Sequence, residues 1–150
     1  MSITLGALNV TDLSTNGLLF EIREGKPFTL AEYIGADDDI PLASGMDPGK
    51  WRASSRTVSL YGVCLGSGAD LAAQQASFYD RMIALKTVMD PDSLLTITTA
   101  GEFGAASATL ENCRPQRMVT QSEFGSIQWI GHLELICIDS PPDWVVVEGS

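Results

Sequence analysis

The sequence predicts a mainly β domain of the α+β class: an antiparallel β sandwich or open barrel with one flanking α-helix. Short segments in which apolar and polar residues alternate recur along the chain, and turn-forming Gly, Pro, Asp and Ser residues separate them. Only one segment, from about residue 71 to 89, has apolar residues at the spacing of an amphipathic helix. Many strands and one helix favour a sheet that packs on itself and on that helix.

The length and composition indicate a single globular domain over residues 1–150. Hydrophobic residues make up 45% of the chain and charged residues 19%, which is typical of a folded domain with a sizeable core. The first residues form neither a basic segment nor a long apolar stretch, and no apolar run is long enough to span a bilayer. We therefore expect no signal peptide, no membrane insertion, and a soluble protein that is made in a cytoplasm.

The chain is strongly acidic. Its 19 Asp and Glu residues against 9 Lys and Arg residues give a formal net charge of −10 at pH 7. A surface of this charge repels phosphate groups, which argues against tight nucleic-acid binding. The inner surface of a channel that passes DNA without holding it would also be acidic or neutral. The charge is therefore compatible with an ordinary soluble protein and with a DNA conduit.

The amino-terminal half contains three predicted strands and one long loop. Residues 17–23 and 28–35 form two short strands, and residues 56–65 form a stronger one, because apolar and polar residues alternate along it. Between them, residues 36–55 carry several Gly, Pro and Asp residues and show no clear periodicity. A loop of this length inside a compact domain is usually functional or becomes ordered against a partner.

The predicted helix begins after a Gly-Ser-Gly break, where the side chain of Ser67 or Asp70 can cap it, and it ends before Pro91. Its apolar stripe predicts that it lies on the sheet. The residues assigned to this stripe are Leu71, Phe78, Met82, Leu85 and Met89, widened by Tyr79 and Ile83.

Two predicted strands follow the helix, at 94–99 and 106–114, with a hairpin loop between them. Pro115 ends the second strand because proline cannot donate a ladder hydrogen bond, and a strand pattern restarts near 116–121.

The longest predicted strand is 126–138. It is apolar on much of both faces, which predicts that each face is covered, either by the helix or by a neighbouring subunit. The tail, 139–150, is predicted to leave the sheet as an extended segment.

Residue types that carry catalysis or bind metals do not form a recognisable site. The one histidine, His132, lies in a predicted strand without a nucleophile motif beside it. The cysteines Cys64, Cys113 and Cys137 are far apart in the sequence and lack a CxxC or Cys/His cluster, so we expect them to be reduced and structural. The acidic run at 37–39 lacks the spacing of a calcium loop. We therefore expect no enzymatic activity, no cofactor and no metal site.

The order of small motifs is more informative. A strand that begins with Arg56 leads through a Gly-rich break into the helix, and short strands at 94–97 and 108–113 follow. The last strand closes on 136–144, where an acidic residue, prolines and a tryptophan succeed one another. Over about residues 17–144, this order resembles the siphophage distal tail protein family and, more broadly, the phage tail-tube fold.

The resemblance implies a β sandwich with a flanking helix, six copies of which close into a homohexameric ring around a central channel. Such a ring joins the tail tube to the baseplate, hub or tip proteins, near the tape measure protein, and DNA passes through it without specific binding. The resemblance thus implies a structural virion protein of the phage tail, assembled in the host cytoplasm, whose partners are itself and other tail proteins.

Other functions stay open. A major tail-tube subunit, or a tail terminator or connector ring protein, would share the same features. A β module that binds a small ligand or a carbohydrate is a further alternative. The mass in solution distinguishes them, because a ring subunit forms hexamers or stacks, whereas a ligand-binding module is usually monomeric or dimeric.

The loop at 36–55 is the candidate for contacts between subunits. A ring subunit needs an extended segment that reaches its neighbour, and aromatic and Arg residues are enriched at such contacts. The acidic residues can pair with a basic residue of the neighbour, or they can face the channel and repel DNA. The residues selected as the candidate subunit interface or lumen surface are Asp37, Asp38, Asp39, Trp51 and Arg52.

Overall fold

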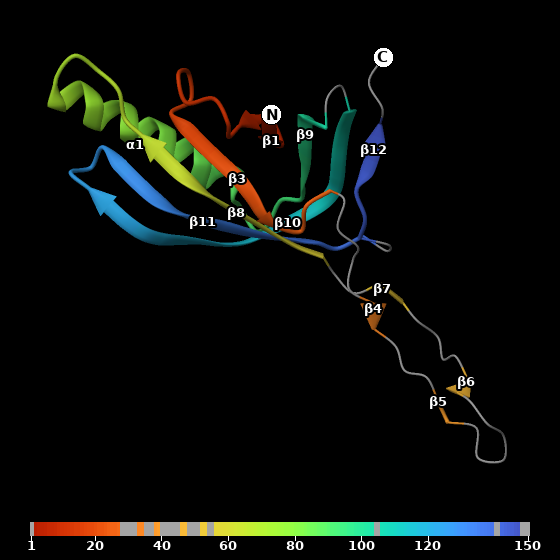
Figure 1. Cartoon of the computed structure of the whole chain (residues 1–150). Coiled ribbons are helices and arrows are strands. Elements are labelled where there is room, and N and C mark those ends of the chain that lie inside the picture. Colours follow the sequence, from red (N-terminus) through yellow and green to blue (C-terminus); the bar gives the residue numbers. More distant parts are fainter. Residues whose placement is uncertain are drawn as a thin grey trace.

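The computed structural model of the protein describes residues 2–27, 56–103, 106–139 and 142–147, together with the backbone of four two-residue strands between residues 33 and 53. Most of the described chain is β-strand, and the one helix within it, α1 (Leu71–Val88), flanks the sheet (Figure 1). The predicted mainly β class with one flanking helix is confirmed.

Eight strands form one antiparallel sheet in the order β2-β1-β9-β10-β11-β8-β3, and β12 pairs with β10 outside this order. Their bounds are β1 (Ser2–Leu5), β2 (Leu8–Asn9), β3 (Leu18–Glu24), β8 (Arg56–Leu65), β9 (Leu95–Phe103), β10 (Ala106–Phe124), β11 (Gln128–Cys137) and β12 (Val145–Val147).

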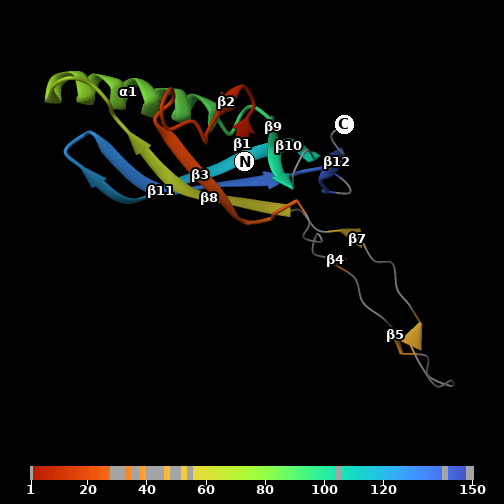
Figure 2. The ribbon, with the colours of Figure 1, turned by 45° about the horizontal axis from the view of Figure 1, so that its top comes forward.

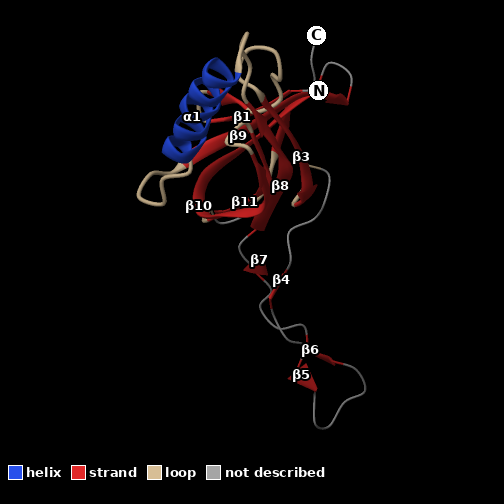
Figure 3. Ribbon diagram, turned by 90° about the vertical axis from the view of Figure 1, so that its left-hand side faces the viewer, coloured by secondary structure: helices blue, strands red, loops and turns tan. Residues whose placement is uncertain are grey.

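The sheet curls until its two ends approach each other. The Phe20 amide in β3 donates to the carbonyl of Val10, just after β2, at 2.9 Å, and the Leu18 amide donates to the Asp12 carbonyl at 3.4 Å. Figure 3 shows the curled strands with α1 along one side. The architecture is therefore an open, incompletely closed barrel, and its inner face forms the core.

The long strand β10 changes partners along its length. Its first part pairs with β9 and β12, and its second part pairs with β11. The register shifts between Leu110 and Cys113, where Asn112 has a φ of 54°, a conformation that Asn tolerates better than most residues. The predicted break at Pro115 is wrong, because the strand continues past it and the proline is accommodated by a second register shift, between Pro115 and Arg117.

The sequence prediction missed β1 and β2. The tail does leave the sheet after β11, as predicted, but β12 returns to it, with Val145 opposite Thr109 and Val147 opposite Ser107. Both differences have one cause: these are strands of only two to four residues. Segments this short carry too few alternations to be recognised by pattern alone.

Of the two predicted capping residues, Ser67 and Asp70, the structure uses Asp70, whose carboxylate accepts a hydrogen bond from the Ala73 amide at 2.8 Å. Phe78 and Leu85 are buried against the sheet. The predicted width of its apolar face is wrong, since three members of the stripe are exposed: Leu71 by 58%, Tyr79 by 56% and Ile83 by 61%. The helix packs along a narrow strip on β8 and β2, and Tyr79 and Ile83, which lie about 100° and 140° around the helix from Phe78, remain in solvent.

Two glycines make room for the aromatic part of the core. Gly62 in β8 and Gly131 in β11 lie directly opposite each other. A Cβ atom on either would collide with a backbone carbonyl of the adjacent strand and with a ring, that of Phe20 for Gly62 and that of Trp129 for Gly131. Because neither glycine has a side chain, the Phe20 and Trp129 rings lie 6.2 Å apart between their centroids.

We expect Gly131→Ala to lower the free energy of unfolding by about 1–3 kcal/mol, the usual cost of overpacking a core. Urea denaturation measures this change. The matched control is Gln121→Ala, an exposed position on the adjacent strand β10, which should change stability by less than about 0.5 kcal/mol. Equal effects of the two substitutions would contradict the close packing at Gly131.

Candidate subunit-interface site

Two nested antiparallel strand pairs, which we call the arm, lie between residues 33 and 53, so they begin in the predicted strand 28–35 and continue through the predicted loop 36–55. β4 (Tyr33–Ile34) pairs with β7 (Arg52–Ala53), and β5 (Asp38–Asp39) pairs with β6 (Met46–Asp47). Figures 1 and 2 show both pairs beyond the ends of β3 and β8, on the side of the molecule opposite α1. The expectation of an irregular loop is thus corrected: the described parts of the segment form a long hairpin that carries the chain away from the sheet.

The structure places three of the five candidate interface residues on this arm. Asp38 and Asp39 form β5, and Arg52 begins β7. Asp37 and Trp51 lie outside the described residues. In the register of the arm, Asp38 is opposite Asp47.

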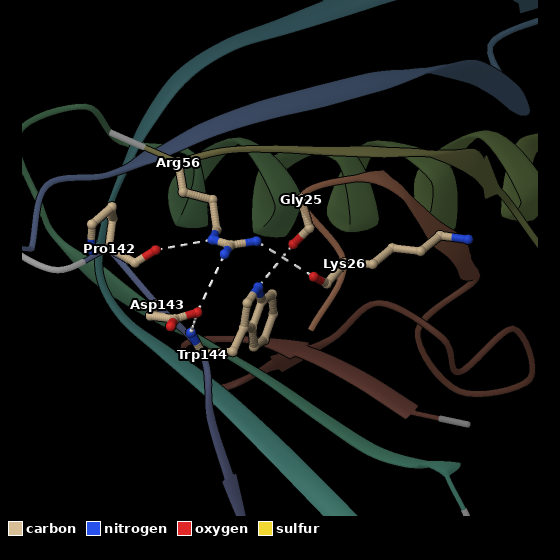
Figure 4. Close-up of polar contacts among 6 residues, drawn as sticks. All are labelled: Gly25, Lys26, Arg56, Pro142, Asp143 and Trp144. Carbon is tan, nitrogen blue, oxygen red and sulfur yellow. Dashed lines mark hydrogen bonds and ion pairs between the residues drawn. The ribbon is translucent and has the colours of Figure 1, made fainter. Parts of the chain in front are cut away.

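The root of the arm is held by a cluster that we call the clasp (Figure 4). Arg56, the first residue of β8, donates from Nε to the Pro142 carbonyl at 2.9 Å and from Nη1 to the Lys26 carbonyl at 3.5 Å. Its Nη2 also contacts the Asp143 carboxylate at 3.2 Å. The Arg56 side chain is only 3% exposed, so these contacts replace the water that a guanidinium group otherwise binds.

Trp144 completes the clasp. Its side chain is directed at the exit of β3, where the indole Nε1 donates to the Gly25 carbonyl at 2.8 Å, and the residue is only 7% exposed. Arg56 and Trp144 together bind the carboxyl-terminal segment to both chain ends from which the arm emerges, residues 25–26 and residue 56. The sequence indicated the acidic–proline–aromatic motif of this segment, but nothing in the sequence identified Arg56 as its partner.

Several charged side chains on the outer face of the sheet are paired with one another. Arg117 and Glu134 form a bidentate pair across β10 and β11, at 2.5 and 2.9 Å, and this hydrogen-bonded guanidinium lowers the pKa of Glu134. His132 stacks on Tyr61, with ring centroids 4.7 Å apart, and its Nε2 lies 3.4 Å from Glu134. The Arg23 guanidinium lies over the Tyr61 ring, with its Cζ atom 4.6 Å from the ring centroid.

The described neighbours of His132 are the Tyr61 ring and the Glu134 carboxylate, and Glu134 is itself paired with Arg117. Within residues 2–27, 56–103, 106–139 and 142–147, no three His, Cys, Asp or Glu residues are grouped so as to hold a metal ion. Over the same ranges, no helix has the length and apolar character of a membrane span.

A depression of about 500 Å³ lies on the same outer face, beside Tyr61 and Ile130. The charged side chains that line it, Glu21 and Arg23, bind each other at 2.8 Å and are more than half exposed. A ligand site usually combines apolar lining with a few polar groups that are shielded from water. The depression therefore gives the alternative of a small-ligand module no specific support.

Comparison with known proteins gives one informative match. No protein-family model matches the sequence, and no curated protein matches it. The crystal structure of the Dit protein of phage SPP1, described as a paradigm of the hub adsorption apparatus in phages that infect Gram-positive bacteria, superposes with a TM-score of 0.59 at 16% sequence identity. The match covers 92% of this chain and 49% of the Dit chain, so this chain spans about half the length of the protein it matches.

A chain of the anti-feeding prophage baseplate also matches, at 16% identity over 86% of this chain and 89% of that one, but its TM-score of 0.29 is too low to carry an argument. The match to Dit, in contrast, extends over nearly the whole chain. The resemblance to the siphophage distal tail proteins is thereby confirmed at the level of the fold.

Proposed function

We propose that this chain is a structural subunit of a bacteriophage tail, which assembles into a ring, six copies to the ring, at the distal end of the tail tube. The observation that carries the proposal is the shared fold with the SPP1 Dit protein over 92% of the chain. In this role the ring links the tube to the baseplate or tip proteins, and DNA crosses its channel without specific binding. No catalytic step is part of the proposal.

The free edges of the sheet support self-association. β12 pairs with β10 on one side, and the side chains of Val145, Val146 and Val147 are all exposed. An exposed edge of β-branched residues is a liability for a monomer and is normally covered by another chain. A contact between two different surfaces of the same protein, repeated around an axis, gives a closed ring.

The arm supplies the second element of the interface. It extends away from the sheet, and its sequence is rich in Asp. A basic residue of the neighbouring subunit can pair with these acidic residues, and Trp51 and Arg52 are residue types enriched at buried contacts. We therefore propose that residues 36–55 reach the neighbouring subunit, with Asp37, Asp38 and Asp39 at the contact or at the channel surface.

Deletion of residues 38–49 should leave a folded monomer that no longer forms rings. The intact chain should show rings in negative-stain images and a mass in solution of about six times 16.0 kDa. The control is Asp92→Asn, which removes an exposed acidic group outside the arm and should leave assembly unchanged. An intact chain that stays monomeric would overturn the ring, whereas a deletion variant that still forms hexamers would overturn only the role of the arm.

Tryptophan fluorescence gives an independent measurement. Of the three tryptophans, Trp129 and Trp144 are already buried in the single chain, so a blue shift of the emission on assembly would report on Trp51. Trp51→Phe should abolish the shift. A shift that persists in this variant would show that Trp51 is not at the contact.

A further inference from the structure

Two of the three cysteines face each other across the sheet. Cys113 in β10 is directly opposite Cys137 in β11. The Ile138 amide donates to the Asn112 carbonyl at 3.1 Å, and this bond flanks the cysteine pair instead of joining its two members. The cysteines therefore occupy a non-hydrogen-bonded position of the antiparallel ladder, where opposed Cα atoms are closest, about 4.5 Å apart. That separation lies within the range of about 4.4–6.8 Å found for disulfides.

Both thiols also contact the same short stretch of β10 backbone, the carbonyls of residues 110 and 111. The register of β10 against β9 shifts between Leu110 and Cys113, next to the cysteine pair. The Cys113 thiol donates to the Leu110 carbonyl at 3.4 Å, and the Cys137 thiol donates to the Glu111 carbonyl at 3.2 Å. Both side chains are completely buried, on the core face of the sheet. The third cysteine, Cys64, lies in β8 opposite Trp129 and has no such partner.

We propose that Cys113 and Cys137 are a redox-sensitive dithiol that forms an intramolecular cross-strand disulfide when the protein meets a small-molecule disulfide such as oxidised glutathione. One thiol loses its proton and attacks a sulfur of the small disulfide, which gives a mixed disulfide and one released thiolate. The second cysteine then attacks the mixed disulfide and releases the other small thiolate. The protein is oxidised by two electrons, one small disulfide is reduced to two thiols, and the two protons end on those thiols.

Burial makes this exchange slow in the folded protein. Removal of the thiolate from water raises the pKa of Cys113 to about 12, and it also raises the pKa of Cys137. The attacking thiolate is therefore scarce at neutral pH, and we expect the rate to rise with pH. The dithiol stays reduced in a reducing cytoplasm and is converted only during longer exposure to oxidising conditions.

The bond would also affect the clasp. Cys137 is the last residue of β11, and the chain runs from it to Pro142 and Trp144, which bind the root of the arm. Asn112, next to Cys113, donates to Asp139 on the same connection at 2.7 Å. A disulfide at this point would fix the start of the carboxyl-terminal segment to the β10 bulge.

The proposal is tested by thiol–disulfide equilibrium on the full chain carrying Cys64→Ser, incubated to equilibrium in reduced and oxidised glutathione. The disulfide is measured by mass after alkylation, in native buffer and again in guanidinium chloride. By linkage, the equilibrium constant in the native protein should exceed that in denaturant by at least about tenfold, and the oxidised form should unfold about 5–10 °C higher. Because the measurement is made at equilibrium, slow exchange in the native protein does not affect it.

The matched control is Cys137→Ser, which leaves Cys64 and Cys113 as the two thiols. This variant should form less intramolecular disulfide in native buffer than in guanidinium chloride. The fold holds Cys64 in β8 and Cys113 in β10, and β11 lies between these two strands in the sheet. The proposal is overturned if the Cys64→Ser chain behaves in the same way, or if its oxidised form unfolds at a lower temperature than the reduced form.

Discussion

Arg56→Met is expected to lower the free energy of unfolding by about 2–4 kcal/mol. The substitution keeps most of the aliphatic volume of a side chain that is 3% exposed, but it removes every donor that the Arg56 side chain contributes to the clasp. The carbonyl of the buried residue Pro142 then loses the donor at 2.9 Å, and a buried acceptor without a partner costs about 1–3 kcal/mol. Urea denaturation, with an unchanged dependence on denaturant, measures the loss.

Two further variants identify which contact of Arg56 matters. Asp143→Asn should cost less than about 1 kcal/mol, because the Asp143 side chain is 57% exposed and an ion pair open to solvent contributes little. Arg56→Lys keeps the charge but not the planar set of donors, so its effect should be intermediate. If Asp143→Asn is as damaging as Arg56→Met, the clasp depends on the ion pair and not on the buried carbonyl of Pro142.

Leu85→Ala is expected to cost about 2–5 kcal/mol, since Leu85 is fully buried between α1 and the sheet and its truncation leaves a cavity. The control is Ile83→Ala on the same helix. Ile83 is 61% exposed, so its truncation should change stability by less than about 0.5 kcal/mol, and the partly buried Met82 should give an intermediate value when changed to Ala.

The comparison tests the corrected orientation of the helix. Thermal and urea unfolding of the three variants should rank Leu85→Ala, Met82→Ala and Ile83→Ala in decreasing order of damage. If Ile83→Ala is destabilised as much as Leu85→Ala, Ile83 is packed in the folded protein, and the wider apolar face predicted from the sequence is correct.

Local patterns predicted the strongest elements well. The strand at 56–65 and the helix from residue 71 have the predicted starts, because each contains enough residues for its period to be recognised and the helix also has its own capping residue. The prediction went wrong where burial depended on a neighbour. Tyr79 and Ile83 only widen the apolar stripe, about 120° and 160° around the helix from Leu85, and the narrow contact of α1 with β8 and β2 leaves them in solvent.

The candidate site shows the same division. The sequence marked residues 36–55, rich in Asp, Gly and Pro, as a long connection, and it contains the motif that ends in Trp144. The opposition of Asp38 and Asp47 could not be read from the sequence, because a shift of one residue in the pairing would have placed other residues opposite each other.

By itself, the sequence determined the mainly β class, the helix that starts near residue 71 and the acidic character of the chain. Only the tertiary structure decided that Arg56 meets the segment from Pro142 to Trp144, that Cys113 faces Cys137, and that β1 pairs with β9. The physical reason is the range of the interactions. Helix caps and strand alternation act between residues a few positions apart, whereas Arg56 and Pro142 are brought together only after the whole sheet between them has curled and closed.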